Sequence, residues 1–367
     1  MYVAPCQRLH PLRDRAPLDA GVRYGLPNAL RLPMRYLDTT PVHDPTLNLA
    51  LEEHVLRTFP DDEDYVLFYV NEPSIIIGRN QNTLEEINAA YVDAHDIHVV
   101  RRVSGGGAVY HDTGNLNFSF ITDYAPDRLN NFAHFTRPVI HALNDLGVPA
   151  ELQGRNDIVV NGRKVSGNAQ YSTGRRMFSH GTLLFDSTLS EVSRALDVKQ
   201  SKIESKGHKS ARSRVANIAE FMDDGFTVAD LRTHLLDTFK AEQDVTVYAP
   251  TESDWDAARA LANEKYRTWD WNYGASPAFD VQRVRRFDEV GEVDVRLSVD
   301  DGHITDAAIY GDFLGHEDVA ELATLLEGVP YRPEALHAAL RDVDVSAYFG
   351  GLDRDRFVAL AYASDEA

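Results

Sequence analysis

Three consecutive glycines, Gly105, Gly106 and Gly107, follow two adjacent arginines in this 367-residue chain. The surrounding segment, residues 101–112, reads Arg-Arg-Val-Ser-Gly-Gly-Gly-Ala-Val-Tyr-His-Asp. Residues without a Cβ atom let a ligand lie directly against the backbone, and successive N–H groups form a concave anion site. The neighbouring guanidinium groups add positive charge and paired donors. The segment therefore predicts a site for an anionic ligand. The alternative is a glycine-rich turn beside two solvated arginines.

Composition limits the partners that the chain can have. The formal net charge of −20 disfavours binding to the phosphate backbone of a nucleic acid. No stretch approaches the roughly 18 consecutive apolar residues that a membrane-spanning helix needs. The single cysteine, Cys6, excludes an internal disulfide and a cysteine-cluster metal site. We therefore expect a cytoplasmic protein that binds neither nucleic acids nor membranes.

Hydrophobic periodicity and turn signals divide the chain into three parts. Residues 1–33 lack a periodic apolar segment, which predicts a poorly ordered extension. Strand-like runs and amphipathic helices follow one another over residues 34–249. Alternating strands and then helices occupy residues 250–367. The pattern predicts an α+β protein, in which a mixed or antiparallel sheet flanked by helices forms a larger domain and a smaller α+β domain follows.

Local turn chemistry places several elements. Asp44-Pro45 predicts the start of a helix that continues to about residue 59. Residues 83–86, Thr-Leu-Glu-Glu, predict a capping box that opens a helix to about residue 94. Asn161-Gly162 is the strongest two-residue hairpin signal, so we expect strands on both sides of it.

Lys164 stands two residues after this hairpin turn and is the only lysine before residue 199. The chain has 30 arginines but only 7 lysines, so lysine is otherwise avoided. Asn156-Asp157 precede it across the hairpin, and Ser166-Gly167-Asn168 follow it. A lysine ammonium is a compact point charge that suits a phosphoryl or acyl oxygen. This context favours a catalytic lysine over a solvated surface lysine.

Two further polar segments could carry chemistry. Ser179-His180-Gly181-Thr182 precedes an apolar strand, and a structural histidine is the simpler interpretation there. Residues 202–214 contain five lysines and arginines and one acidic residue, a local charge of +4 in an acidic chain. This favours a loop that closes on the phosphates of a nucleotide, while an exposed basic loop is the alternative.

Taken together, these motifs closely resemble the lipoate–protein ligase family. The resemblance rests on residues 101–112, 114–118, 78–82, 156–157, 164–169, 180–184 and 206–215. Residues 265–277 are similar to the start of the family's C-terminal accessory domain. The resemblance covers the chain from about Met34 to its end. It implies a catalytic domain over residues 34–249 and an accessory domain over residues 250–367.

The resemblance implies an enzyme that uses ATP and Mg²⁺ to convert lipoate to lipoyl-AMP, and then acylates one lysine of a lipoyl domain. Its protein partners would be the lipoyl domains of 2-oxoacid dehydrogenase complexes or the glycine-cleavage H protein. The catalytic lysine of the family falls on Lys164, and Asp157 is the candidate Mg²⁺ ligand. The implied nucleotide and acyl-adenylate residues are Arg102, Gly105, Gly106, Gly107, Ala108, Val109, Tyr110, Lys164, Lys206, Arg212 and Arg214. The implied lipoate-pocket residues are Val103, Val109 and His111.

Three other functions remain open at this point. An octanoyl or lipoyl transferase would take its acyl group from a carrier and need no ATP, and Cys6 as the only cysteine argues against the members with a cysteine acyl-enzyme. A biotin ligase would carry an arginine–glycine repeat in place of the glycine segment found here. A non-catalytic lipoyl carrier is disfavoured by Lys164 and by the basic segment. Pyrophosphate release from ATP with free lipoate would separate a ligase from a transferase or a carrier.

Overall fold

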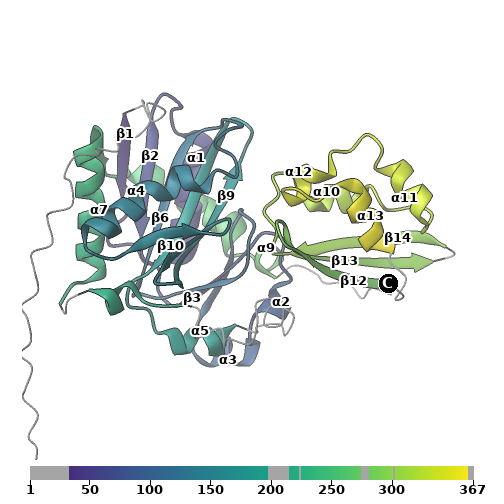
Figure 1. Cartoon of the computed structure of the whole chain (residues 1–367), viewed down its shortest axis with the longest axis horizontal. Coiled ribbons are helices and arrows are strands. Elements are labelled where there is room, and N and C mark those ends of the chain that lie inside the picture. The colour runs from purple at the N-terminus through teal and green to yellow at the C-terminus, as the bar shows by residue number, and fades with distance from the viewer. Residues whose placement is uncertain (1–32, 197–214, 223–224, 274–280, 301, 363–367) are drawn as a thin grey trace, which may run out of the picture. The chain divides into compact units, whose positions relative to one another are not determined.

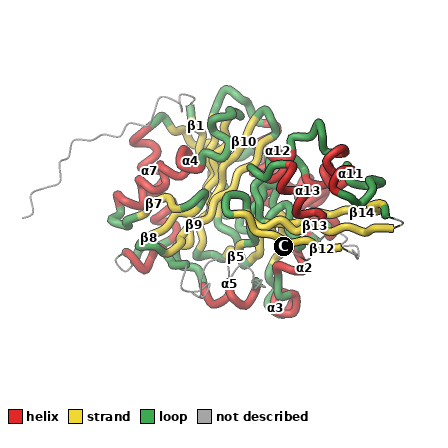
Figure 2. The backbone as a smooth tube through the Cα atoms, turned by 45° about the vertical axis from the view of Figure 1, so that its right-hand side comes forward, coloured by secondary structure: helices red, strands yellow, loops and turns green. Residues whose placement is uncertain are grey.

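The computed structural model describes residues 33–196, 215–222, 225–273, 281–300 and 302–362 (Figure 1). The predicted extension over residues 1–33 lies outside these ranges apart from its last residue. Lys206, Arg212 and Arg214 also lie outside them. Strands and helices are both abundant in the described part, which confirms the predicted α+β class (Figure 2).

A mixed eight-stranded sheet forms the centre of the larger part. Its spatial order is β11-β1-β2-β6-β10-β9-β8-β7. The strands are β1 Met34–Asp38, β2 Asp64–Tyr69, β6 Asn115–Asp123, β7 Ala150–Gln153, β8 Asp157–Val160, β9 Arg163–Ser172, β10 Arg176–Leu184 and β11 Val245–Tyr248. β1 pairs in parallel with β2 and β11, whereas the strands from β2 to β7 along the sheet pair antiparallel.

Two three-stranded sheets accompany the large one. The first, in the order β4-β3-β5, consists of β3 Ser74–Ile77, β4 His98–Arg101 and β5 Val109–His111. The second consists of β12 Val281–Phe287, β13 Gly291–Asp300 and β14 His303–Gly311, all antiparallel. The segment between β4 and β5 contains Gly105–Gly107, so the first small sheet holds both ends of the glycine loop.

The helices are distributed along the whole described chain. They are α1 Pro45–Thr58, α2 Thr83–Glu86, α3 Ala89–Ala94, α4 Phe132–Asp145, α5 Leu189–Ala195, α7 Val228–Glu242, α8 Glu252–Leu261, α9 Trp269–Asn272, α10 Val319–Thr324, α11 Pro333–Ala339, α12 Val345–Phe349 and α13 Arg354–Tyr362. A 3₁₀ helix spans Ile218–Phe221 and a π-helix spans Ala262–Tyr266.

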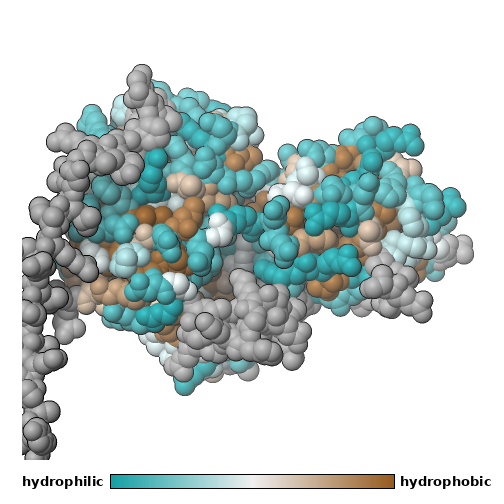
Figure 3. All heavy atoms as spheres, in the orientation of Figure 1, coloured by the Kyte–Doolittle hydropathy of each residue, from teal (hydrophilic) through white to brown (hydrophobic). Residues whose placement is uncertain are grey.

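Helices cover both faces of the large sheet, so its central strands are buried on both sides. Every residue of β2 is buried. Val66 and Phe68 point to the core shared with α4 and α7, and Tyr65 and Leu67 point to the core shared with α1, as the two-residue period of a strand requires (Figure 1). Hydrophilic side chains predominate on the face shown in Figure 3, with apolar ones in smaller patches.

Two local predictions are confirmed. α1 begins at Pro45, and the Asp44 side chain accepts hydrogen bonds from the backbone N–H groups of Thr46 and Leu47. Asn161 and Gly162 have φ values of 51° and 76° and join β8 to β9. These positive values are those of the predicted two-residue hairpin turn.

The single helix predicted from residue 83 to about residue 94 is wrong. The chain forms two short helices, α2 and α3, with Ile87 and Asn88 between them. Ile87 is extended and pairs with Leu196, and the Asn88 side chain caps the second helix by accepting from Tyr91 N. The long-range pairing and the new cap therefore outweigh the local helix signal.

The division of the chain at residue 250 stays a prediction. Ala258, Ala262 and Tyr266 pack in the same apolar core as α1. The residues of β12, β13 and β14 form a separate apolar core with α10 to α13. None of the helices in the described part of the chain is long and apolar enough to cross a membrane.

Candidate active site

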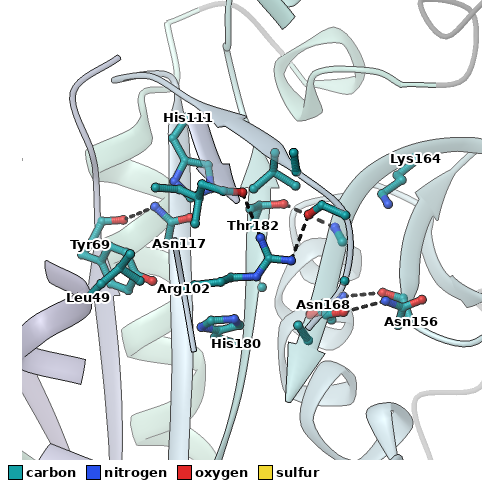
Figure 4. A pocket seen from close by; sticks show the side chains of 18 residues that line it. Leu49, Tyr69, Arg102, His111, Asn117, Asn156, Lys164, Asn168, His180 and Thr182 are labelled. Atoms are coloured by element: carbon teal, nitrogen blue, oxygen red, sulfur yellow. Dashed lines mark hydrogen bonds between the residues drawn. The ribbon is translucent and has the colours of Figure 1, made fainter. Parts of the chain in front are cut away.

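A cavity of about 150 Å³ lies where α1, the large sheet and the first small sheet meet. It is lined by Leu49, Tyr69, Ile76, Arg102, Gly106, Gly107, Ala108, Val109, His111, Asn117, Asn156, Lys164, Gly167, Asn168, Ala169, His180, Gly181 and Thr182. Figure 4 shows Leu49, Tyr69 and His111 on one side of it and Lys164 on the other. The cavity therefore has Lys164 with the amides of Asn156 and Asn168 on one side, and Leu49 with the rings of Tyr69 and His111 on the other.

Both arginines at the start of the glycine segment are buried, so the alternative of two solvated arginines is wrong. The Arg102 guanidinium donates from Nη1 to Ile76 O at 2.9 Å, and from Nη2 to Gly105 O at 2.7 Å and Gly107 O at 2.9 Å. Burial lowers the pKa of Arg102 to about 10, so the group is still charged at neutral pH. Arg102 thus holds the shape of the glycine loop, and most of its N–H groups are committed to that task.

The three glycines meet different surroundings. Gly106 has a φ of +92°, which L side chains rarely adopt, and a Cβ atom there would lie 2.9 Å from Arg102 Nη2. A Cβ atom on Gly105 would lie 2.4 Å from Phe313 O. A Cβ atom on Gly107 would meet no described atom within 4 Å. Gly107 is therefore the member of the loop whose backbone has open space for a ligand.

A buried chain of hydrogen bonds connects the glycine loop to α1. Ser104 Oγ lies 2.7 Å from His180 Nε2, and His180 Nδ1 lies 3.0 Å from Glu52 Oε1. Because the Glu52 carboxylate can only accept, His180 Nδ1 donates to it. Arg102 Nε in turn donates to Ser104 Oγ at 3.0 Å.

The serine–histidine–carboxylate order resembles a hydrolase triad, but the geometry indicates a positioning role. Ser104 is fully buried and does not line the cavity, and its oxygen is already shared between Arg102 and His180. A nucleophile would need access to the substrate. His180 is thus a structural residue, as its sequence context indicated, and it also contributes to the cavity wall.

Sequence reasoning missed Glu52 and several cavity residues. Glu52 is only 1% exposed although it belongs to an adjacent pair of glutamates in an amphipathic helix. Nothing in the local sequence distinguishes it from a solvated glutamate, because its partner His180 is 128 residues away. Leu49, Tyr69 and Asn117 were also missed, since apolar and amide residues inside regular elements normally indicate packing.

Lys164 and Asp157 lie on the neighbouring strands β9 and β8. Lys164 Nζ is 2.7 Å from Asp157 Oδ1, with side-chain exposures of 39% and 30%. A Cβ atom on Gly167 would lie 3.0 Å from Lys164 Nζ, so the absence of a side chain there makes room for the lysine. Two residues that follow the basic segment in the chain contact Lys164: Val215 pairs with it, and Ala216 N donates to Lys164 O at 2.9 Å.

Of the fourteen sequence-predicted site residues, eleven lie in the described part of the chain, and seven of these line the cavity. Its lining includes Arg102, Gly106, Gly107, Ala108, Val109, His111 and Lys164. Gly105 and Asp157 lie next to lining residues. Tyr110 points to the opposite side of β5, into the cluster with Ile75 and Ile77, because side chains alternate along a strand. Val103 is buried in the core behind the cavity.

We expect Gly167→Ala to lower the rate of pyrophosphate release from ATP by about tenfold to a hundredfold. Displacing a catalytic group by about 1 Å can lower a rate by that factor. The added methyl group would displace the flexible end of Lys164 and weaken its contact with Asp157. The thermal midpoint should change little. The same substitution in a Lys164→Ala background should have no further effect on the rate. An additional loss in that background would show that Gly167 acts independently of the lysine.

Comparison with known proteins identifies the family to which the chain belongs. The model of the lipoyl protein ligase A/B catalytic domain matches residues 44–240, and the model of the bacterial lipoate protein ligase C-terminus matches residues 276–360. The chain is 52% identical over 332 residues to lipoate-protein ligase LplJ of Bacillus subtilis. The matched region spans 90% of this chain and 100% of that protein.

Solved structures of related proteins contain the expected ligands. The structure of P. falciparum LipL1 in complex with lipoate has a TM-score of 0.70 and 25% identity, and covers 85% of this chain and 94% of its own. The structure of lipoate-protein ligase A bound with ATP has a TM-score of 0.58 and 30% identity. The match covers 66% of this chain and 99% of that one. A third structure is a bipartite lipoate protein ligase of Thermoplasma acidophilum, described with its E2 lipoyl domain. It has a TM-score of 0.59 and 30% identity, and the match covers 68% of this chain and 100% of that one. This chain belongs to the lipoate–protein ligase family.

Proposed function

We propose that the cavity binds lipoate and ATP, forms lipoyl-AMP, and presents the lipoyl group to a lysine of a lipoyl domain. The observation that carries this proposal is the arrangement of the cavity, in which Lys164 lies at one end and Leu49 and Tyr69 lie at the other, while the open backbone at Gly107 forms part of the lining. A linear acyl chain with a terminal carboxylate has the same polarity. Lipoate and ATP are also the ligands named for the related structures.

In the first step, a carboxylate oxygen of lipoate attacks the α-phosphorus of ATP. The new oxygen–phosphorus bond forms as the bond to the pyrophosphate oxygen breaks. The Lys164 ammonium can stabilise the negative charge that develops on the α-phosphoryl oxygens, because its ion pair with Asp157 holds it in place before the reaction. The open space beside Gly107 lets a phosphoryl group approach the loop backbone there.

Asp157 can take part in this step in two ways. It holds Lys164 through a 2.7 Å ion pair in the free protein. It is also an oxygen donor of the kind that Mg²⁺ prefers, and Mg²⁺ commonly binds through one or two carboxylates together with substrate phosphates. Among the described residues no group of three or more metal-ligating side chains occurs, so substrate oxygens and water would have to complete such a site. Bound Mg²⁺ would neutralise charge on the phosphates.

In the second step, the amine of the acceptor lysine attacks the acyl carbonyl of lipoyl-AMP. The carbon–nitrogen bond forms as the carbon–oxygen bond to the phosphate breaks, AMP leaves with the electron pair, and the nitrogen loses a proton to solvent to give the amide. Lys164 can polarise the acyl carbonyl from the same position, which explains how one residue serves both steps. We propose the lipoyl domains of 2-oxoacid dehydrogenase complexes, or the glycine-cleavage H protein, as acceptors in the cytoplasm. The description of the related T. acidophilum ligase with an E2 lipoyl domain supports this class of partner.

Release of pyrophosphate tests the proposed function. With ATP and Mg²⁺, we expect pyrophosphate to appear on addition of lipoate and not on addition of biotin. A purified lipoyl domain should then gain the mass of one lipoyl group. Acylation of the lipoyl domain from an acyl-carrier donor, without pyrophosphate release from ATP and lipoate, would identify a transferase instead.

A further inference from the structure

A row of directly opposite residues crosses five strands of the large sheet at the cavity. In antiparallel pairs, side chains that lie directly opposite one another project from the same face of the sheet. The register of β9 and β10 places Gly167 opposite Thr182, and Gly167 N donates to Thr182 Oγ1 at 3.3 Å. Thr182 therefore lies in the middle of the row, which from β8 to β2 consists of Asp157, Gly167, Thr182, Asn117 and Tyr69.

The end of the Lys164 side chain lies over Gly167 and next to Thr182. A Cβ atom on Gly167 would lie 3.0 Å from Lys164 Nζ and 3.2 Å from its Cε, so the ammonium stands where a side chain of Gly167 would project. Neighbouring strands are about 4.8 Å apart, and Thr182 is the next side chain of the row on that face. A substrate oxygen bound to Lys164 Nζ on this side therefore lies within hydrogen-bond reach of the Thr182 hydroxyl.

The Thr182 hydroxyl has a proton to donate to a ligand. Its oxygen accepts from Gly167 N, and no described residue accepts its proton. A hydroxyl has one donor and two acceptor sites, so the bond from Gly167 orients the oxygen and leaves the O–H group free. Thr182 is partly exposed and lines the cavity (Figure 4). Asn117, the next residue of the row, is already engaged, because it donates to Tyr69 O and accepts from Asn115 Nδ2.

We propose that the Thr182 hydroxyl donates a hydrogen bond to the acyl oxygen of lipoyl-AMP while the lipoyl group is transferred. This inference rests on the proposed function, which puts the carboxyl carbon of lipoate beside Lys164. As the acceptor amine adds to the acyl carbon, the electron pair of the C=O bond moves onto the oxygen. Thr182 and Lys164 stabilise this charge together, since preorganised donors act most strongly where charge develops. When the pair returns, the carbon–oxygen bond to the phosphate breaks, AMP leaves with its electrons, and the nitrogen loses a proton to solvent.

The same hydroxyl contributes much less to the formation of lipoyl-AMP. The carboxylate of lipoate is negatively charged before it attacks the α-phosphorus, and its charge decreases during the attack. A donor to its other oxygen therefore binds the ground state at least as well as the transition state, and such binding does not accelerate the step. Thr182 thus acts mainly in the second step, whereas Lys164 acts in both.

Two substitutions at Thr182 and two rates test this role. Thr182→Val keeps the shape of the side chain without the hydroxyl, and Thr182→Ser keeps the hydroxyl. One rate is the first-turnover release of pyrophosphate from ATP and lipoate, and the other is single-turnover transfer from supplied lipoyl-AMP to a lipoyl domain. We expect Thr182→Val to slow transfer about a hundredfold and pyrophosphate release by no more than about threefold. Thr182→Ser should transfer within about threefold of the wild-type rate.

Thr233→Val is the matched control, because Thr233 is exposed on α7 and does not line the cavity. Both of its rates should equal those of the wild type. Equal losses of both rates in Thr182→Val would show that the valine displaces Gly167 and Lys164, and would overturn the proposal. An unchanged transfer rate in that variant would overturn it as well.

Infrared spectroscopy of lipoyl-AMP labelled with ¹³C at the acyl carbon gives a readout without turnover. The C=O stretch of the bound molecule should lie at a lower wavenumber in the wild type and in Thr182→Ser than in Thr182→Val, because a hydrogen bond weakens the C=O bond. Equal wavenumbers would reject the contact. A wild-type protein that shows the shift and the hydroxyl-dependent transfer, but releases no pyrophosphate from ATP and lipoate, would reject the proposed activation step and retain the role of Thr182.

Discussion

Replacing Lys164 with alanine should slow the formation of lipoyl-AMP by about a hundredfold to a thousandfold, which is typical of the loss of one preorganised group that stabilises transition-state charge. The side chain is partly exposed at the end of a hairpin, so its removal should leave the thermal midpoint nearly unchanged. Pyrophosphate release measured at saturating ATP and lipoate gives the rate. Differential scanning fluorimetry gives the midpoint.

Lys240 offers a matched control for Lys164, because it is an exposed lysine on α7 that does not line the cavity. Lys240→Ala should retain the wild-type rate. Asp157→Asn should retain the lysine but loosen it, so its effect on the rate should be smaller than that of Lys164→Ala. A Lys164→Ala variant with near-normal pyrophosphate release would remove Lys164 from the mechanism and leave the cavity without an assigned catalytic cation.

Local sequence signals predicted those parts of the fold and site that depend on neighbouring residues. Asp44-Pro45 starts α1 as expected, and Asn161-Gly162 forms the hairpin that places Lys164 beside Asp157. Each of these features is fixed by backbone preferences within a few residues. The broken helix at Ile87 shows the limit of such signals, because its cause is a pairing with Leu196, more than a hundred residues away.

The function of buried polar residues was much harder to predict. Arg101 was a candidate anion ligand, but its guanidinium donates to the backbone oxygens of Gly78, Gln81 and Trp271. Arg101 therefore joins segments of the backbone, and one of its partners, Trp271, lies 170 residues further along the chain. The prediction for Tyr110 could have been corrected from the sequence alone. Side chains alternate along a strand, so Tyr110 cannot face the same cavity as Val109 and His111.

Replacing Arg102 with leucine should have the largest effect on stability among the cavity residues. The guanidinium satisfies the carbonyl oxygens of Ile76 and Gly105 in a buried environment and that of Gly107 in a partly buried one. Leucine would leave these acceptors unpaired, and each unsatisfied buried group costs about 1–3 kcal/mol. Partial relaxation of the loop would recover some of this cost. We therefore expect the free energy of unfolding, measured with urea, to fall by roughly 3–5 kcal/mol.

Arg175→Leu is the matched control, since its side chain is 66% exposed and its ion pair with Asp61 lies at the surface. Surface ion pairs contribute about 0–1 kcal/mol, so this variant should unfold almost like the wild type. A second readout separates the loop from general stability. At a temperature where both variants are folded, Arg102→Leu should raise the KM for ATP, because the loop backbone near Gly107 would no longer be held in place. If Arg102→Leu unfolds like Arg175→Leu and keeps its KM for ATP, the loop is held by other contacts and Arg102 has no positioning role.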